Sequence, residues 1–279
     1  MRKILVLGSN GALGTSICKT LKKKKFFCFA QSRSKRNKYF CNFKNKLNFK
    51  KLIEKIKPNI VINTISNINI NECEQDFYKC HQDNIQTAKI ISDVCGDKKI
   101  KQIYISSDQV YSGKGPHKEN KIKPLNNYGI SKIIAENLVL HNNGTVLRVN
   151  FIHKDKKKRT FHDQIINSYK IKKFFLYKDI FFNPLHISTL SEIIVENLVK
   201  FKNDVYNIGA YNKISKEKFI IKFCNKMNIK GNFKSVNYSS NATNRPKDMN
   251  MDIKKISRLI KFAKYDIYEE INKLVNDYK

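Results

Sequence analysis

The feature that most constrains the fold is a glycine-rich turn directly after an apolar run at the N-terminus. Residues 3–8 read KILVLG, which is typical of a buried parallel strand. A tight turn, a close approach to a pyrophosphate and close helix–strand packing each require a residue without a Cβ atom. We therefore expect a dinucleotide-binding loop rather than an ordinary turn of small residues. Its expected cofactor-binding residues are Gly8, Asn10, Gly11, Ala12, Leu13 and Gly14.

Strand-like and helix-like segments alternate after this loop. Apolar runs predict strands at 26–30, 59–65, 100–107 and 145–152, and helical spacing predicts helices at 47–57, 77–96 and 126–140. This order indicates right-handed βαβ units and a parallel sheet covered on both faces. We therefore predict an α/β protein with a Rossmann-type, doubly wound parallel sheet over residues 1–150.

The alternation of strand-like and helix-like segments becomes less regular after about residue 150. Helices are expected at 161–171, 189–201 and 216–227 and in two segments from 252 onward, with a short strand at 204–209. Residues 151–279 are therefore expected to form a smaller C-terminal α+β substrate lobe, with elements that return to the first domain.

The formal charge of +32 would suit a polyanion partner, but its distribution argues against one. Lysines are spread along the whole chain, and arginine, the better base and phosphate reader, is scarce. A general drift towards Lys, Asn and Ile explains the charge, so nucleic acid is an unlikely partner. The seven cysteines contain no Cys-x-x-Cys, and no His, Asp or Glu spacing indicates a metal.

No apolar run in the sequence approaches about 18 residues, so no membrane span is expected. The N-terminal apolar run is too short for a signal peptide, which indicates a cytoplasmic protein.

The end of the second strand favours one form of the cofactor. In dinucleotide folds an acidic residue here binds the ribose 2′-hydroxyl, whereas an arginine can bind a 2′-phosphate. No acidic residue follows this strand, and Ser32 and Arg33 stand there instead. NADP(H) is therefore preferred, with NAD(H) as the alternative, unless these residues only reflect the general basicity.

Tyr128 and Lys132 lie one helical turn apart and project from the same helix face. Such pairs arise by chance about twice in a chain this rich in lysine. Tyr169 and Lys173 are a second example, so the surrounding motifs must decide.

Several motifs follow one another in a recognisable order. SDQVYSG occupies 107–113, GPHKE occupies 115–119, and NYGISK occupies 127–132. VINTISNININECE lies at 61–74 and NRPKDMNMD at 244–252. With the glycine loop, these resemble the extended short-chain dehydrogenase/reductase superfamily, and within it the dTDP-4-dehydrorhamnose reductase family. The resemblance covers most of the chain.

This resemblance implies an NAD(P)H-dependent reductase in which Tyr128 gives its proton to a carbonyl oxygen as hydride reaches the carbon. Lys132 is expected to lower the phenol's pKa and to contact the nicotinamide ribose. Ser107 is expected to donate a hydrogen bond to the same oxygen. Asn84 matches a residue that supports the lysine. Further cofactor contacts are expected from Asn42, Thr64, Ile65 and Ser66.

The implied substrate is a keto-sugar carried on a nucleoside diphosphate. Arg245 and Arg148 are the arginines best placed for a diphosphate, although Arg148 can equally form a buried structural ion pair. Asp108, Val110 and Asn150 complete the expected substrate contacts.

Gln109 stands where related dehydratases carry a catalytic glutamate, which disfavours dehydration. The alternatives are an epimerase and a non-catalytic relative, like the regulatory subunit of methionine adenosyltransferase, which resembles the same family. A homodimer is a further assembly that we consider.

Overall fold

A six-stranded parallel sheet forms the centre of the molecule in a computed structural model of the chain. The model describes residues 2–34, 36–155, 157, 160–170, 173–239, 244–260 and 265–279. The strands lie in the order β10-β5-β4-β3-β1-β2. They are β1 (Lys3–Leu7), β2 (Phe27–Gln31), β3 (Ile60–Asn63), β4 (Lys101–Ser107), β5 (Thr145–Val149) and β10 (Val205–Ile208). The chain leaves β1 in one direction to β2 and returns on the other side as β3, so the switch point lies beside β1. The predicted Rossmann-type sheet is confirmed.

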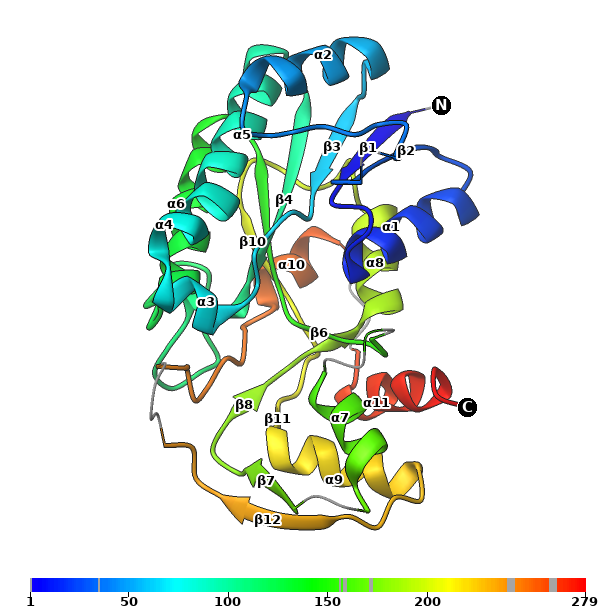
Figure 1. Cartoon of the computed structure of the whole chain (residues 1–279), viewed down its shortest axis with the longest axis vertical. Coiled ribbons are helices and arrows are strands. Elements are labelled where there is room, and N and C mark those ends of the chain that lie inside the picture. Colours follow the sequence, from blue (N-terminus) through cyan, green and yellow to red (C-terminus); the bar gives the residue numbers. More distant parts are fainter. Residues whose placement is uncertain are drawn as a thin grey trace.

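Helices cover both faces of the sheet (Figure 1). Alternate residues of β1 explain why, because Ile4 and Val6 pack on one face while Leu5 and Leu7 pack on the other. One face carries α1 (Ala12–Lys23) and α8 (Ile187–Glu196), and the other carries α2 (Lys46–Ile56), α5 (Thr87–Asp97) and α6 (Asn127–His141).

The predicted helix over 77–96 is interrupted. It consists of α4 (Phe77–Cys80), a π-helical turn (His81–Gln86) and α5, and α3 (Ile70–Gln75) precedes it. The predicted strand over 145–152 likewise divides into β5 and β6 (Phe151–Ile152). A π-helical turn is rare and is often found at functional sites.

The C-terminal lobe is built from short elements. Its helices are α7 (Phe161–Ser168), α9 (Lys216–Lys226) and α11 (Ile267–Asn276), whereas α10 (Lys254–Leu259) packs against β10 of the sheet. Three strand pairs connect them, namely β6 with β9 (Leu185–His186), β7 (Lys173–Tyr177) with β12 (Asn232–Val236), and β8 (Phe181–Phe182) with β11 (Ile214–Ser215). The last residue of the helix predicted at 161–171 lies outside the described residues.

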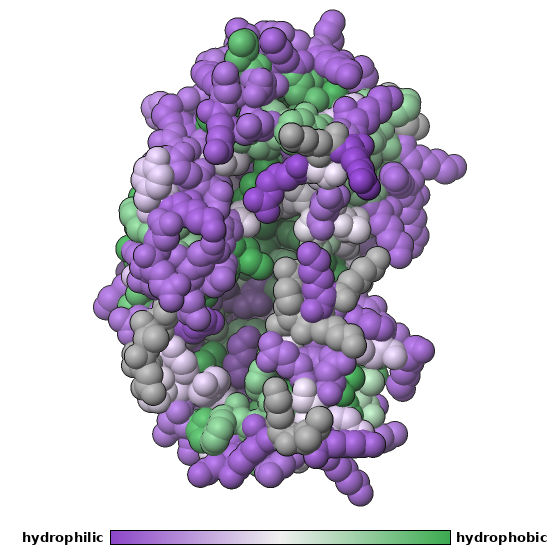
Figure 2. Space-filling model, viewed as in Figure 1, coloured by the Kyte–Doolittle hydropathy of each residue, from purple (hydrophilic) through white to green (hydrophobic). Residues whose placement is uncertain are grey.

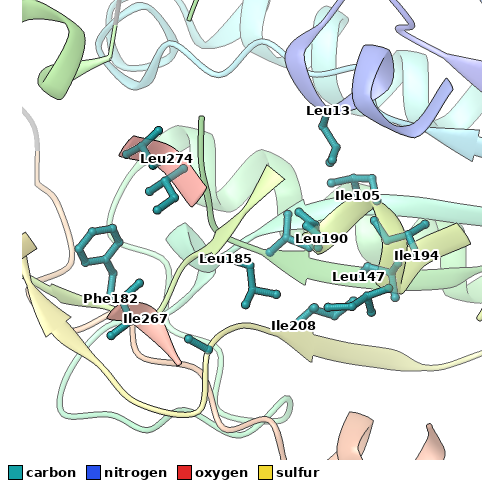
Figure 3. Packing of buried hydrophobic residues seen from close by; sticks show 14 of the residues in the cluster. Leu13, Ile105, Leu147, Phe182, Leu185, Leu190, Ile194, Ile208, Ile267 and Leu274 are labelled. Atoms are coloured by element: carbon teal, nitrogen blue, oxygen red, sulfur yellow. The ribbon is translucent and has the colours of Figure 1, made fainter. Parts of the chain in front are cut away.

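One hydrophobic cluster joins the lobe to the sheet. Leu13 of α1, Ile105 of β4 and Leu190 of α8 pack at one end, and Phe182 and Leu274 of the lobe lie at the other (Figure 3). The face shown in Figure 2 is hollowed between the part that carries the sheet and the part that carries α7, α9 and α11. None of the helices in the described residues is long and apolar enough to cross a membrane.

Candidate active site

The glycine loop has the close packing that only glycine permits. Gly8 has a φ of 78°, and a Cβ atom there would lie 2.8 Å from the Thr64 hydroxyl oxygen. A Cβ atom at Gly14 would lie 2.4 Å from the Gly8 carbonyl oxygen. Gly11 is the N-cap of α1 and supplies no side-chain cap. The first N–H groups of this helix are therefore available to an anion.

Gln31 ties this loop to the end of β2 and was not anticipated from the sequence. Its side-chain oxygen accepts a hydrogen bond from the Gly8 N–H (3.2 Å), and its amide nitrogen donates to the Ser32 carbonyl (3.0 Å). Gln31 and Ser32 are buried, whereas Arg33 and Asn42 are exposed. The sequence signal for this role of Gln31 is that a polar residue ends an otherwise apolar strand.

The loop after β3 links the glycine loop to the π-helical turn. The Thr64 hydroxyl donates to the Leu7 carbonyl (2.7 Å), which places it against Gly8. The Ile65 N–H is held by the Asn63 side chain (3.0 Å). The Ser66 hydroxyl then donates to Asn84 Oδ1 (3.2 Å).

Asn84 lies in the π-helical turn and fixes the start of α6. Its Oδ1 accepts from the Asn67 N–H (2.7 Å), and its Nδ2 donates to the Ser131 hydroxyl (3.0 Å). Ser131 in turn donates to the Tyr128 carbonyl (2.7 Å). Asn84 therefore acts on the turn that carries Tyr128 and Lys132, with Ser131 as an intermediate that the sequence reasoning missed.

Three hydroxyl groups meet at the end of β4. Tyr128 is only 6% exposed, and burial raises its pKa to about 12, although hydrogen bonding with Ser107 and Ser66 opposes this rise. The Ser107 hydroxyl also accepts from the Gln109 N–H (3.2 Å). Residues from the loop after β3, from the end of β4 and from α6 are thus brought together.

Lys132 is held away from solvent by contacts with β4. Its ammonium donates to the Ile105 carbonyl (2.9 Å) and lies 4.2 Å from the centre of the Tyr104 ring. Burial lowers the pKa of Lys132 itself to about 7. Lys132 is not among the groups that shift the pKa of Tyr128, so the lowering of the phenol's pKa by the ammonium stays a prediction.

Arg148 is not free to bind a diphosphate. It is 2% exposed and forms a buried ion pair with Glu136 (2.6 Å), which joins β5 to α6. Its remaining nitrogen donates to the Tyr111 hydroxyl (2.7 Å) and the Glu119 carbonyl (2.6 Å). The structural alternative for Arg148 is therefore correct, and the substrate role is not.

Val110 also requires correction, because it is completely buried against Tyr111 and Met251. A side chain in this position stabilises the loop after β4 and has no surface to offer a substrate.

Of the other expected substrate residues, Asp108 directly follows β4 and Asn150 directly follows β5. Burial raises the pKa of Asp108, whose carboxylate accepts hydrogen bonds from Asn150 and Ser107. Arg245 is exposed and donates to Asn71 of α3 (3.2 Å). The Gln109 amide oxygen is buried and has no partner among the described residues.

A separate cavity of about 660 Å³ lies at the β10 edge of the sheet and is lined by Glu119, Tyr206 and Lys255, among others. It contains none of the predicted catalytic or cofactor residues, so we do not assign the reaction to it.

Comparison with known proteins identifies a family. The family model described as "RmlD substrate binding domain" matches residues 1–279. Methionine adenosyltransferase 2 subunit beta of Xenopus tropicalis is 29% identical over 173 residues, which are 56% of this chain and 49% of that protein. A dTDP-4-dehydrorhamnose reductase of Aggregatibacter actinomycetemcomitans is 26% identical over 144 residues, 50% of this chain and 47% of that protein. The chain thus spans about half the length of the curated relatives it matches.

A crystal structure of dTDP-4-dehydrorhamnose reductase from Bacillus anthracis in complex with NADP has the same fold, with a TM-score of 0.88. It is 19% identical, and the match covers 99% of each chain.

Proposed function

We propose that this chain, which belongs to the RmlD substrate binding domain family, is an NADP(H)-dependent reductase of a keto-sugar on a nucleoside diphosphate. One observation carries the proposal. The loop after β3 joins the two ends of the site, because Thr64 lies against Gly8 while Ser66, two residues later, meets Tyr128 together with Ser107. A coenzyme bound by its phosphates at the glycine loop can therefore extend its nicotinamide towards the phenol.

The residues around the loop fit a dinucleotide. The crowding at Gly8 and Gly14 leaves backbone, not side chain, at the surface where a pyrophosphate binds, and α1 presents its free N–H groups there. The exposed Arg33 suits a 2′-phosphate, with the buried Ser32 beside it as a further proposed contact, and the NADP complex of the Bacillus anthracis reductase supports the same preference. NAD(H) is the alternative. Further proposed contacts are Asn10, Gly11, Ala12, Leu13, Asn42, Ile65, Asn84 and Lys132.

The Tyr128 side chain, which lies at the end of β4 with Ser107, supplies the proton. The bound coenzyme would supply hydride to the carbonyl carbon. Tyr128, whose raised pKa keeps it protonated, gives its proton to the carbonyl oxygen, and the product is an alcohol. Ser107 donates a hydrogen bond that orients this oxygen. Solvent then returns a proton to Tyr128.

The substrate class is proposed from the family and from the polar residues next to Ser107. Asp108 and Asn150 lie next to Ser107 and suit sugar hydroxyls, whereas Arg245 suits a diphosphate. Gln109 lacks the carboxylate that a dehydratase needs, which favours simple reduction.

A second candidate is a regulatory relative without catalysis, favoured by the 29% identity to methionine adenosyltransferase 2 subunit beta. The intact set of Ser107, Tyr128 and Lys132 argues against it, because a purely structural role does not require a proton donor beside the coenzyme site.

The test combines binding with turnover. Nucleoside-diphosphate sugars, NADPH and NADH are screened by thermal shift, and the true pair should give the largest stabilisation by mass action. The pair is then assayed for NADPH consumption with the 4-keto form of the sugar. Binding without consumption on any keto-sugar would favour the regulatory candidate.

We also propose a homodimer formed through α6. Ile130 and Ile134 lie one turn apart on this helix and are 38% and 39% exposed. Light scattering should give twice the mass of 32.7 kDa, and Ile134→Lys should convert the dimer to monomer. A wild-type monomer at micromolar concentration would contradict this proposal.

A further inference from the structure

The Lys132 ammonium lies over the face of the Tyr104 ring. Its nitrogen is 4.2 Å from the ring centre, and it donates a hydrogen bond to the carbonyl of Ile105, the next residue of β4 (2.9 Å). Among the described residues, this carbonyl is the one hydrogen-bond acceptor of the ammonium. Lys132 and Tyr104 are each 1% exposed, so bulk water does not solvate the charge. The charge must therefore be stabilised by the groups that touch it.

The titratable groups around Lys132 do not supply a carboxylate partner. Glu136 follows one turn later on α6, but its carboxylate is engaged in the buried ion pair with Arg148 of β5 (2.6 Å). The other titratable side chains nearby in the described part of the chain are the Cys80 thiol of α4 and the Tyr128 phenol. The Tyr104 ring is thus the largest group in direct contact with the ammonium.

The Tyr104 ring has the properties that such a contact requires. Burial raises the pKa of its phenol well above the usual value, so the ring stays neutral and keeps the partial negative charge of its faces. The ring is fixed by packing in a hydrophobic cluster that includes Val139 of α6 and Val146 of β5. Its hydroxyl group has no hydrogen-bond partner among the described residues. The contact with Lys132 is therefore the polar interaction of this side chain.

We infer that Tyr104 is a positioning residue for the reaction, because the face of its ring holds the Lys132 ammonium in its charged form beside the coenzyme site. The inference rests on the proposed function, in which Lys132 contacts the coenzyme. A cation over an aromatic face is stabilised most where water is excluded. Tyr104 thereby favours the charged lysine, whereas burial alone favours the neutral amine.

A graded replacement of the ring tests the inference. Tyr104→Phe keeps the ring face, whereas a variant in which trifluorinated phenylalanine replaces Tyr104 keeps nearly the same shape and loses the negative charge of the face. NMR of the lysine side chains in the free protein follows their titration, and the Lys132 signal is identified by its absence from Lys132→Met. The Lys132 ammonium should lose its proton about one pH unit lower in the trifluorinated variant than in Tyr104→Phe.

Val146→Ala is the matched control, because it removes packing from the same cluster and leaves the ring in place. It should lower the stability of the protein and leave the titration of Lys132 unchanged. Equal titrations of Lys132 in Tyr104→Phe and in the trifluorinated variant would overturn the inference. A shift in Val146→Ala as large as that in the trifluorinated variant would overturn it as well, in favour of packing alone.

Turnover connects the contact to the reaction. In the NADPH-loaded enzyme, the alkaline limb of kcat/KM for the keto-sugar should move to lower pH in the trifluorinated variant, in the same direction as the NMR titration. A titration shift that leaves this limb in place would restrict Tyr104 to a structural role and overturn the inference, while the reductase proposal survives. A wild-type protein that reduces no keto-sugar would remove the proposed function and the positioning role with it.

Discussion

At the scale of single residues, burial sets the protonation of the candidate site. The same desolvation raises the pKa of Tyr128 to about 12 and lowers that of Lys132 to about 7. The phenol is therefore ready to give a proton, while the lysine is poised to lose one. The spacing of the two residues does not predict the direction of either pKa shift, because each shift depends on how completely the surrounding chain excludes water.

Lys132→Met should change the pH dependence of stability. The pKa of Lys132 is lowered in the folded protein from its ordinary 10.5 to about 7, so unfolding takes up a proton between these values. The destabilisation that comes from burying the charged Lys132 ammonium is fully present below pH 7 and disappears as the pH rises to about 10.5. The variant should gain on the order of a few kcal/mol relative to wild type at pH 6, and this difference should shrink towards pH 10. Chemical denaturation at several pH values measures it, and a difference that does not vary with pH would contradict the burial argument.

At the scale of elements, a buried ion pair holds β5 to α6. Arg148→Met leaves Glu136 buried without its partner and should cost about 3–5 kcal/mol of unfolding free energy. The double replacement with Glu136→Met should cost less than the sum of the two single replacements. The substrate KM of the folded fraction should stay unchanged. A stable Arg148→Met with a raised KM would restore the substrate role that the structure removes.

The packing of α1 on the glycine loop gives a second prediction at this scale. In Gly14→Ala the added Cβ atom meets the Gly8 carbonyl, so the loop must shift and coenzyme affinity should fall more than tenfold. Gly113→Ala is the control, because Gly113 has a φ of 87° but open space around it. It should lose about 1 kcal/mol of stability and keep its coenzyme affinity. Equal coenzyme affinities of the two variants would contradict the role of the loop.

The elements also show how far the sequence predicts the structure. The long apolar runs and the glycine loop predicted five strands of the sheet, because a parallel strand buried on both faces is continuously apolar. The two-residue strands β8, β9 and β11 are too short for such a pattern, since only their tertiary pairing defines them. In the site, motifs located Ser107 and Tyr128, but the roles of Gln31 and Ser131 depend on hydrogen bonds to residues far away in the sequence, which the local pattern does not reveal.

At the scale of the whole molecule, the charge of +32 should attract the anionic coenzyme and substrate. Salt screens this attraction over a Debye length of about 10 Å at 0.1 M. The kcat/KM should therefore fall several-fold as KCl rises from about 20 mM to about 300 mM, whereas kcat at saturation should change little. A kcat/KM that does not vary with salt would show that the charge has no such role. Binding of a nucleic-acid duplex with a defined stoichiometry would assign the charge to another partner.

The replacement Tyr128→Phe tests the central claim most directly, because it removes only the hydroxyl that meets Ser107 and Ser66 at the end of β4. Turnover of the keto-sugar and affinity for NADPH are measured on the same preparation. We predict that kcat falls by about 10²–10⁴ while the NADPH Kd stays within about twofold of wild type. A variant that reduces the keto-sugar as fast as wild type would contradict the assignment of Tyr128 as the proton donor.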